Sequence, residues 1–178
     1  MEFVEKVDLE LFNKTKARWE AQLKANPTNV SETFYSAAIE NCERHVREEV
    51  ELGDGDGCVA GVVGDDGYAK ALFIISHARG RSTAPDLKLL TLYVEPDLNA
   101  ADRDPDIPQL ATIAAIAIVG CLEMTYTTFP AKQLKIFTAI PLDKDFLQSI
   151  MTASFSRGQL KGKFRVSSHG NWLVAEKV

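Results

Sequence analysis

The run of residues 107–122 contains no charged side chain, and it constrains the fold of this chain more than any other segment. It contains Pro108 and Gln109 and is shorter than a bilayer span, which needs about 20 apolar residues. Its apolar character on all sides predicts a buried helix from Ile107 to about Thr127. Apolar runs at residues 87–94 and 134–140 flank this helix and predict strands. A strand–helix–strand unit of this kind predicts a parallel pair of strands joined by a right-handed crossover.

The remaining segments place further elements around this unit. Residues 3–7 predict a short strand, and amphipathic helices are expected from residue 9 to 23 and from Ser31 to Gly53. Two hairpins are expected, one around the Asp66-Gly67 turn and one at residues 164–178, with a short helix at 143–155 before the second. The order β-α-α-β-β-β-α-β-α-β-β predicts an α/β fold, with a mixed sheet covered by helices on both faces. With 178 residues and no linker or repeat, residues 1–178 are expected to form one domain.

Charge and cysteine content argue against several classes of function. The net charge of −5 disfavours a general binder of nucleic acid or of anionic membranes. The cysteines Cys42, Cys58 and Cys121 have no close spacing, so neither a disulfide framework nor a metal site is expected. Because the N-terminus also lacks an apolar leader, a cytoplasmic location is expected.

The fourth expected strand ends in Leu92-Tyr93-Val94-Glu95-Pro96, a hydrophobic strand that closes in Val-x-Pro. In this motif, and in the element order over nearly the whole chain, the sequence resembles the GNAT superfamily of N-acetyltransferases. The resemblance implies transfer of an acetyl group from acetyl-CoA to an amine. It also implies that the backbone of Leu92, Tyr93 and Val94 binds the acyl-CoA and polarises its thioester carbonyl.

The loop after this strand departs from the family pattern. GNAT proteins continue with Arg/Gln-x-x-Gly-x-Gly/Ala, whose amides hold the CoA pyrophosphate. Here residues 97–108 contain no glycine and four aspartates, and Arg103 is the one residue that could pair with a phosphate. The family's fourth-helix tyrosine, which protonates the departing thiolate, is also missing, and Phe155 stands where it is expected. The sequence therefore resembles a GNAT-like fold with a degenerate acyl-CoA pyrophosphate loop.

Two side chains are candidates for the general base of such a reaction. Glu95 directly follows the strand, where its carboxylate could accept a proton from an amine. His77 ends the preceding strand and could face the same cleft, and histidine is the side chain that most often serves as a general base. In the family, the region that holds Trp19, Phe34 and Tyr35 here shapes the acceptor site, although docking of two helices on a sheet also explains these aromatics.

Three functions remain open from the sequence. The first is an active acetyltransferase that uses acetyl-CoA and an amine acceptor. The second is a catalytically inactive GNAT-fold protein that contacts another protein, for example a phage accessory or inhibitory protein, through the acidic loop at residues 95–106. The third is a small-molecule binding module that uses the cleft without chemistry. The partner is accordingly an amine or a protein, and a homodimer is also open.

Overall fold

The computed structural model describes residues 1–25, 32–47, 55–78, 85–98, 106–138, 141–156 and 161–178, and it has the predicted order of elements. Seven strands form one sheet in the order β1-β2-β3-β4-β5-β7-β6. The strands are β1 (Glu2–Val4), β2 (Gly55–Val63), β3 (Ala69–Ala78), β4 (Asp86–Val94), β5 (Gln133–Phe137), β6 (Phe164–His169) and β7 (Trp172–Lys177). The helices are α1 (Leu9–Ala25), α2 (Glu32–Val46), α3 (Ile107–Met124) and α4 (Pro141–Phe155), with a 3-10 turn η1 (Pro96–Leu98) after β4.

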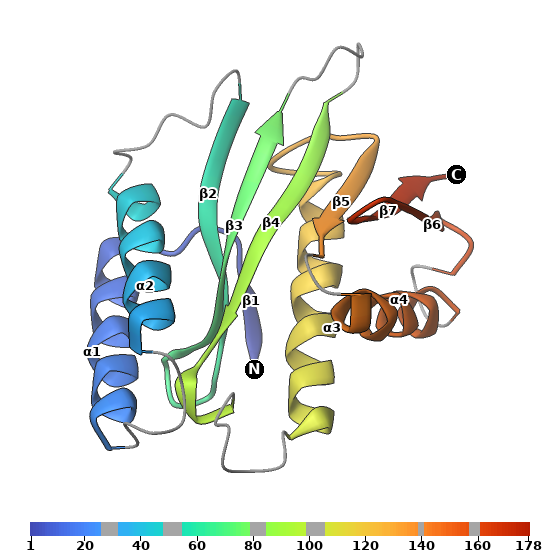
Figure 1. Cartoon of the computed structure of the whole chain (residues 1–178). Helices are drawn as coiled ribbons and strands as arrows, with labels where there is room; N and C mark the ends of the chain where they lie inside the picture. The colour runs from blue at the N-terminus through green and yellow to red at the C-terminus, as the bar shows by residue number, and fades with distance from the viewer. Residues whose placement is uncertain (26–31, 48–54, 79–84, 99–105, 139–140, 157–160) are drawn as a thin grey trace.

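Helices cover both faces of the sheet, as the sequence predicted (Figure 1). The pair α1 and α2 packs on β2, β3 and β4, where Trp19 and Tyr35 are fully buried against Leu72 and Ile74. On the other face, α3 and α4 share a core with Phe73, Leu134 and other buried strand residues. The pair β4–β5 is parallel and every other pair is antiparallel. The predicted α/β fold class with a mixed sheet is therefore confirmed.

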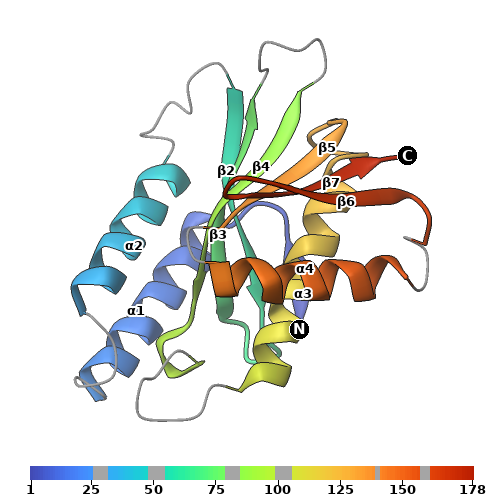
Figure 2. The same cartoon turned by 45° about the vertical axis from the view of Figure 1, so that its right-hand side comes forward.

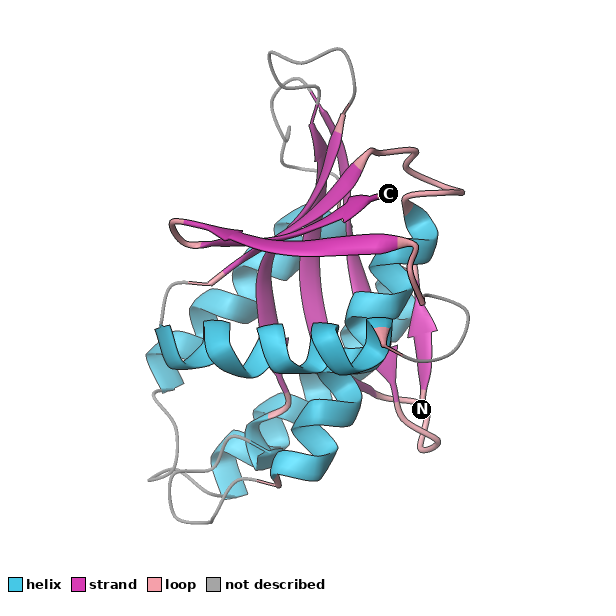
Figure 3. Ribbon diagram, turned by 90° about the vertical axis from the view of Figure 1, so that its right-hand side faces the viewer, coloured by secondary structure: helices cyan, strands magenta, loops and turns pink. Residues whose placement is uncertain are grey.

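The C-terminal hairpin extends the sheet beyond β5. Figures 2 and 3 show α4 running beneath the β6–β7 hairpin, with which it shares the buried pair Phe155 and Phe164, whose rings stack at 5.5 Å. The hairpin turns at Gly170, whose φ of 57° suits a residue without a side chain. The turn also brings Asn171 beside Thr138, whose amide donates to the Asn171 carbonyl. β5 ends at Phe137, and residues 139 and 140, the expected end of this strand, lie outside the described residues.

The predicted buried helix is α3, and eight of its residues are buried against the rest of the fold. By length and composition alone α3 could cross a membrane, but in this structure it is the central helix of the core. The second helix ends at Val46 and Arg47 lies in a turn; the rest of its expected range, up to Gly53, lies outside the described residues. Its expected start at Ser31 lies outside the described residues, and α4 begins two residues earlier than expected, at Pro141.

Candidate functional site

The main feature of the sheet is that β4 and β5 pair over only half the length of β4. Their parallel register runs from Asp86, opposite Gln133, to Leu89, opposite Ile136. Beyond that point the β3–β4 register skips Leu90, which forms a bulge in β4. The last residues of β4 thus continue past the last register pair with β5, and the sheet opens there (Figure 1).

A cleft of about 470 Å³ occupies this opening. A volume of this size is within the range of about 300–1,000 Å³ typical of small-molecule sites. Residues from both faces of the sheet line it: α2 contributes from one face, and α3 and α4 contribute from the other. The lining is mostly apolar and comprises Phe34, Tyr35, Leu90, Thr91, Leu92, Tyr93, Val94, Leu110, Ile113, Ala114, Phe137, Thr138, Phe146 and Leu147.

The hydrogen-bond ladder shows which backbone groups of β4 face the cleft. The amide of Glu95 donates to a carbonyl of β3 at 2.9 Å. In an antiparallel pair, successive residues turn their backbone groups alternately toward and away from the partner strand. Tyr93 is therefore turned toward β3 like Glu95, whereas Leu92 and Val94 are turned toward the β5 side, where Val94 accepts a hydrogen bond from the Tyr35 hydroxyl. Of the three residues expected to bind with their backbone, two direct that backbone into the cleft.

Two tyrosine hydroxyls stand at this cleft. That of Tyr35 donates to the carbonyl of Val94 at 2.6 Å. That of Tyr93 accepts a hydrogen bond from the side-chain amide of Asn41 at 3.3 Å, so this bond does not use its own proton. Tyr93 is 8% exposed and is held between β4 and α2. Its hydroxyl therefore keeps a proton that it can donate.

The mouth of the cleft on the α2 side is aromatic. Phe34 is 50% exposed and packs edge-on against Tyr93. Phe137, at the end of β5, is 40% exposed and lies 5.2 Å from the ring of Trp172. Exposed aromatic rings that line a cleft are typical of ligand-binding surfaces, and ring faces also attract ammonium groups. This mouth suits a ligand with an apolar substituent or a cationic amine.

The N-terminus of α3 does not fit a CoA pyrophosphate. Asp106 caps the helix: its carboxylate accepts the amide of Gln109 at 3.0 Å, and its carbonyl accepts the amide of Leu110 at 2.9 Å. Pro108 has no N–H to offer. A phosphate site needs free N–H groups and little negative charge at a helix start. The described start of α3 therefore offers no phosphate site, and Arg103 lies outside the described residues.

Glu95, expected as an accessible loop carboxylate, is 3% exposed. Its carboxylate pairs with the ammonium of Lys70 at 3.0 Å and accepts a hydrogen bond from Gln22 at 3.2 Å. The pair lies between α1 and β3 and does not line the cleft. In this structure Glu95 therefore links a helix to the sheet, and its role as a base stays a prediction.

His77 is far from Glu95 along the sheet. It is in register with Leu87 at the start of β4, whereas Glu95 follows the end of β4. Its Nε2 lies 3.0 Å from the carbonyl of Pro130, which can only accept, so Nε2 carries the proton. The imidazole also packs against Phe129 at 5.3 Å. The structure does not bring the two base candidates together, because they stand at opposite ends of the paired strands.

The fourth helix meets the cleft at its beginning rather than at its end. Phe155, expected to replace the family's tyrosine, is buried against β6. The α4 residues that line the cleft are Phe146 and Leu147. Neither carries a proton donor. That Phe155 stands in place of the family's tyrosine stays a prediction.

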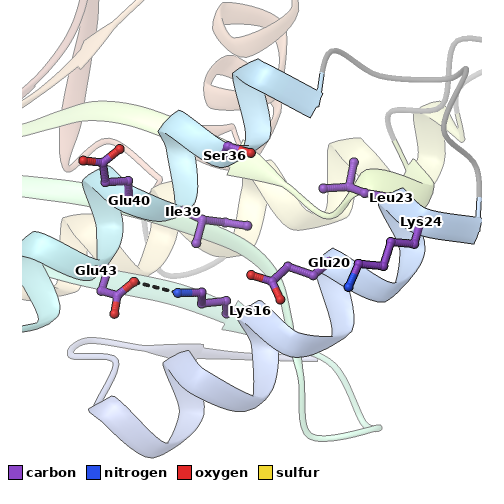
Figure 4. A pocket seen from close by; sticks show the side chains of 8 residues that line it. All are labelled: Lys16, Glu20, Leu23, Lys24, Ser36, Ile39, Glu40 and Glu43. Atoms are coloured by element: carbon purple, nitrogen blue, oxygen red, sulfur yellow. Dashed lines mark hydrogen bonds and ion pairs between the residues drawn. The ribbon is translucent and has the colours of Figure 1, made fainter.

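A second hollow, of about 520 Å³, lies between α1 and α2 on the side away from the sheet (Figure 4). Its walls are mostly charged, and Lys16 is paired with Glu43 across it at 2.8 Å. Among the described residues, no group of three His, Cys, Asp or Glu side chains is placed to hold a metal ion. The hollow between α1 and α2 shares no lining residue with the cleft between β4 and β5.

Comparisons with known proteins bear on the fold. No family model matches the chain, and no curated protein matches it. A crystal structure described as a probable acetyltransferase is similar, with a TM-score of 0.51 and 11% sequence identity, over 96% of this chain and 99% of the other. The fold is GNAT-like. At this identity the similarity extends to architecture alone, so the function must be argued from the cleft.

Sequence reasoning missed parts of this site. Phe137 and Thr138 border the cleft at the end of β5, and no local sequence pattern indicates that the strand ends there. The bulge at Leu90 depends on the register between β3 and β4, and no local sequence pattern indicates it either. The cap could have been found, because an aspartate just before a helix with a proline in its first turn is a known start signal.

Proposed function

We propose that this protein transfers an acyl group from an acyl thioester to an amine. The observation that carries the proposal is the parting of β4 and β5, which opens a cleft through the sheet and turns the backbone of Leu92 and Val94 into it. A thioester can enter from the side of α3 and α4, and an amine can approach from the side of α2. The GNAT-like fold supports the same conclusion by analogy.

The reaction needs little beyond a positioned backbone and one proton donor. The amine nitrogen attacks the thioester carbonyl carbon, a C–N bond forms, and the C–S bond then breaks. The N–H groups of Leu92 and Val94 are turned toward the side where the carbonyl oxygen gains negative charge and would stabilise it. The hydroxyl of Tyr93 gives its proton to the departing sulfur and regains one from water. The proton released by the amine leaves to solvent.

The acceptor is an amine with an apolar or aromatic substituent. Phe34 and Phe137 expose ring surface at the mouth on the acceptor side, and Tyr93 lies between that mouth and the cleft. Burying this surface against an apolar substituent is favourable by about 25 cal/mol per Å². The mouth therefore favours substituted amines over small hydrophilic ones.

The test is a transfer assay with purified protein, two acetyl thioesters (acetyl-CoA and S-acetylpantetheine), and a panel of amines that includes phenethylamine and putrescine. Thiol release gives the rate, and mass spectrometry of the acylated amine gives the product. The protein's own thiols do not disturb the assay, since Cys42, Cys58 and Cys121 are buried. Transfer to phenethylamine above the uncatalysed rate is expected; no acylated amine with either donor would overturn the proposal.

The inactive-protein alternative rests on the acidic loop, of which residues 99–105 lie outside the described residues. The capped start of α3 is compatible both with an inactive protein and with acyl transfer, so it does not favour the inactive protein. A cytoplasmic location, a homodimer and a protein partner stay predictions from the sequence. Acyl transfer remains the function that the cleft supports best.

A further inference from the structure

The first turn of α3 offers almost nothing to a diphosphate. Of the amides at residues 107–110, that of Gln109 is used by the Asp106 carboxylate and that of Leu110 by the Asp106 carbonyl. Position 108 is proline and has no amide proton. Only the amide of Ile107 is left, and one N–H group does not make an anion site.

The charge around this helix start is also wrong for a diphosphate. The carboxylate of Asp106 stands at the helix N-terminus itself, where a bound anion would otherwise lie. The described part of the preceding segment adds Asp97 in η1 and no lysine or arginine. Among the described residues of this segment, the charges repel a phosphate rather than bind it.

The cleft, by contrast, suits the part of the donor next to the acyl group. Leu110, Ile113 and Ala114 of α3 line it together with Phe146 and Leu147 of α4. This apolar channel is bordered by the edge of β4, where backbone groups of residues 92 and 94 are turned away from β3. A slender chain that carries amide groups can pair with such an edge as an added strand does.

We propose that this protein recognises its donor through the pantetheine-type arm that carries the acyl group, and that the nucleotide diphosphate half of CoA is dispensable for binding. This inference rests on the proposed acyl-transfer function and narrows its donor class. The donor is any acyl thioester with a flexible, amide-containing arm, with or without a nucleotide attached. The structural feature behind this inference is the capped first turn of α3, where Asp106 occupies amides that a diphosphate would need.

Binding tests this without requiring catalysis. The dissociation constants of CoA, pantetheine and 3′,5′-ADP are measured by calorimetry at low and high salt. CoA and pantetheine are expected to bind within about threefold of each other, with little effect of salt, because the phosphates make no anchoring contact. No binding or competition by 3′,5′-ADP is expected. CoA binding more than about 30-fold tighter than pantetheine, or displacement of CoA by 3′,5′-ADP, would overturn the inference.

Two substitutions of Asp106 distinguish the effect of its negative charge from the effect of its hydrogen bond to the amide of Gln109. Asp106→Asn removes the charge and keeps a side chain that caps equally well, whereas Asp106→Gly also releases the amide of Gln109 at little cost to the helix. Asp106→Gly is expected to tighten CoA by about tenfold and to leave pantetheine unchanged, and Asp106→Asn should have a smaller effect on CoA. An unchanged ratio of the two affinities in Asp106→Gly would show that the cap is not what excludes the diphosphate.

A variant of the channel supplies the matched control. Ala114 is 3% exposed and lines the channel, so Ala114→Leu should weaken the binding of CoA and of pantetheine by the same factor. The outcomes distinguish this inference from the proposed function. Binding of neither CoA nor pantetheine at millimolar concentration would overturn both. Strong preference for CoA, together with transfer of its acetyl group, would overturn only the donor inference and leave the acyltransferase intact.

Discussion

The hydroxyl of Tyr35 on α2 donates a 2.6 Å hydrogen bond to the backbone carbonyl of Val94 at the end of β4. That carbonyl points to the side on which β5 would have paired with it, had β5 continued. Tyr35 is 1% exposed and its ring packs edge-on against Trp19, so its position is set by the core beneath α2. A helix side chain thus takes the place of a strand partner and keeps the edge of the cleft ordered.

Tyr35→Phe should therefore lower the free energy of unfolding by about 1 kcal/mol, because it removes one hydrogen bond and leaves the Val94 carbonyl without it. Urea unfolding followed by circular dichroism measures the change. The matched control is Tyr126→Phe, since Tyr126 is 54% exposed and its ring contacts with Phe164 and Lys177 do not need the hydroxyl. Equal effects of the two substitutions would mean that the bond to Val94 contributes nothing to stability.

Tyr93→Phe should lower kcat by about 100-fold in the transfer assay, the size expected when a positioned acid is removed. KM for the donor should change little, because the ring that lines the cleft is kept. The hydroxyl accepts the amide of Asn41, so the same change should cost about 1 kcal/mol of stability. An unchanged kcat would exclude Tyr93 as the proton donor while leaving its place in the cleft wall intact.

Glu95→Gln should separate a structural role from a catalytic one. The change breaks the ion pair with Lys70, which keeps a second partner in Asp66 at 3.1 Å. The expected loss of stability is about 2 kcal/mol, below the 3–5 kcal/mol typical of a buried charge left wholly unpaired. If Glu95 only links α1 to the sheet, kcat/KM keeps its dependence on pH; loss of the acidic limb of that profile would instead identify Glu95 as the base.

Much of the fold could be predicted because its signals are local. The uncharged run in α3, the Asp66-Gly67 turn and the apolar run in β4 each indicate their own element, and the order of the elements then gives the topology. The ends of elements were predicted less well, because they depend on neighbours. β5 stops at Phe137 where the hairpin turn reaches Thr138, a contact between segments far apart in the chain.

The site was harder to predict than the fold, for the same reason. The sequence places Glu95 at a strand end, where an accessible base is expected. In the fold its carboxylate is bound by Gln22 and Lys70, which are distant in sequence. The cleft itself depends on the bulge at Leu90 and on the short β5, and neither leaves a mark in local composition. Local sequence patterns indicate the secondary structure of each segment, whereas this cleft forms where β4 and β5 no longer pair.

Gly120→Ala should destabilise the fold through a contact with the N-terminal strand. A methyl group at Gly120 of α3 would lie 2.2 Å from ring atoms of Phe3, so β1 would have to move. Phe3 also packs against Phe73 of β3, which limits that movement. Overpacking of this kind costs about 1–3 kcal/mol. The double variant with Phe3→Ala should show a smaller effect of Gly120→Ala than the single variant does; strictly additive losses would rule out this contact as the cause.

The thiol of Cys42 should make the protein less stable in alkali. Burial raises its pKa from 9.0 to about 12, because the thiolate would have to form inside the core beneath α2. Above pH 9 the unfolded chain releases this proton and the folded chain does not, so the unfolded state gains stability as pH rises. The free energy of unfolding should therefore fall about 1.4 kcal/mol per pH unit more steeply in the wild type than in Cys42→Ala between pH 10 and 11. Tyrosines and lysines titrate in both proteins, so the difference between the two slopes isolates the thiol, and parallel slopes would mean that Cys42 ionises freely in the folded state.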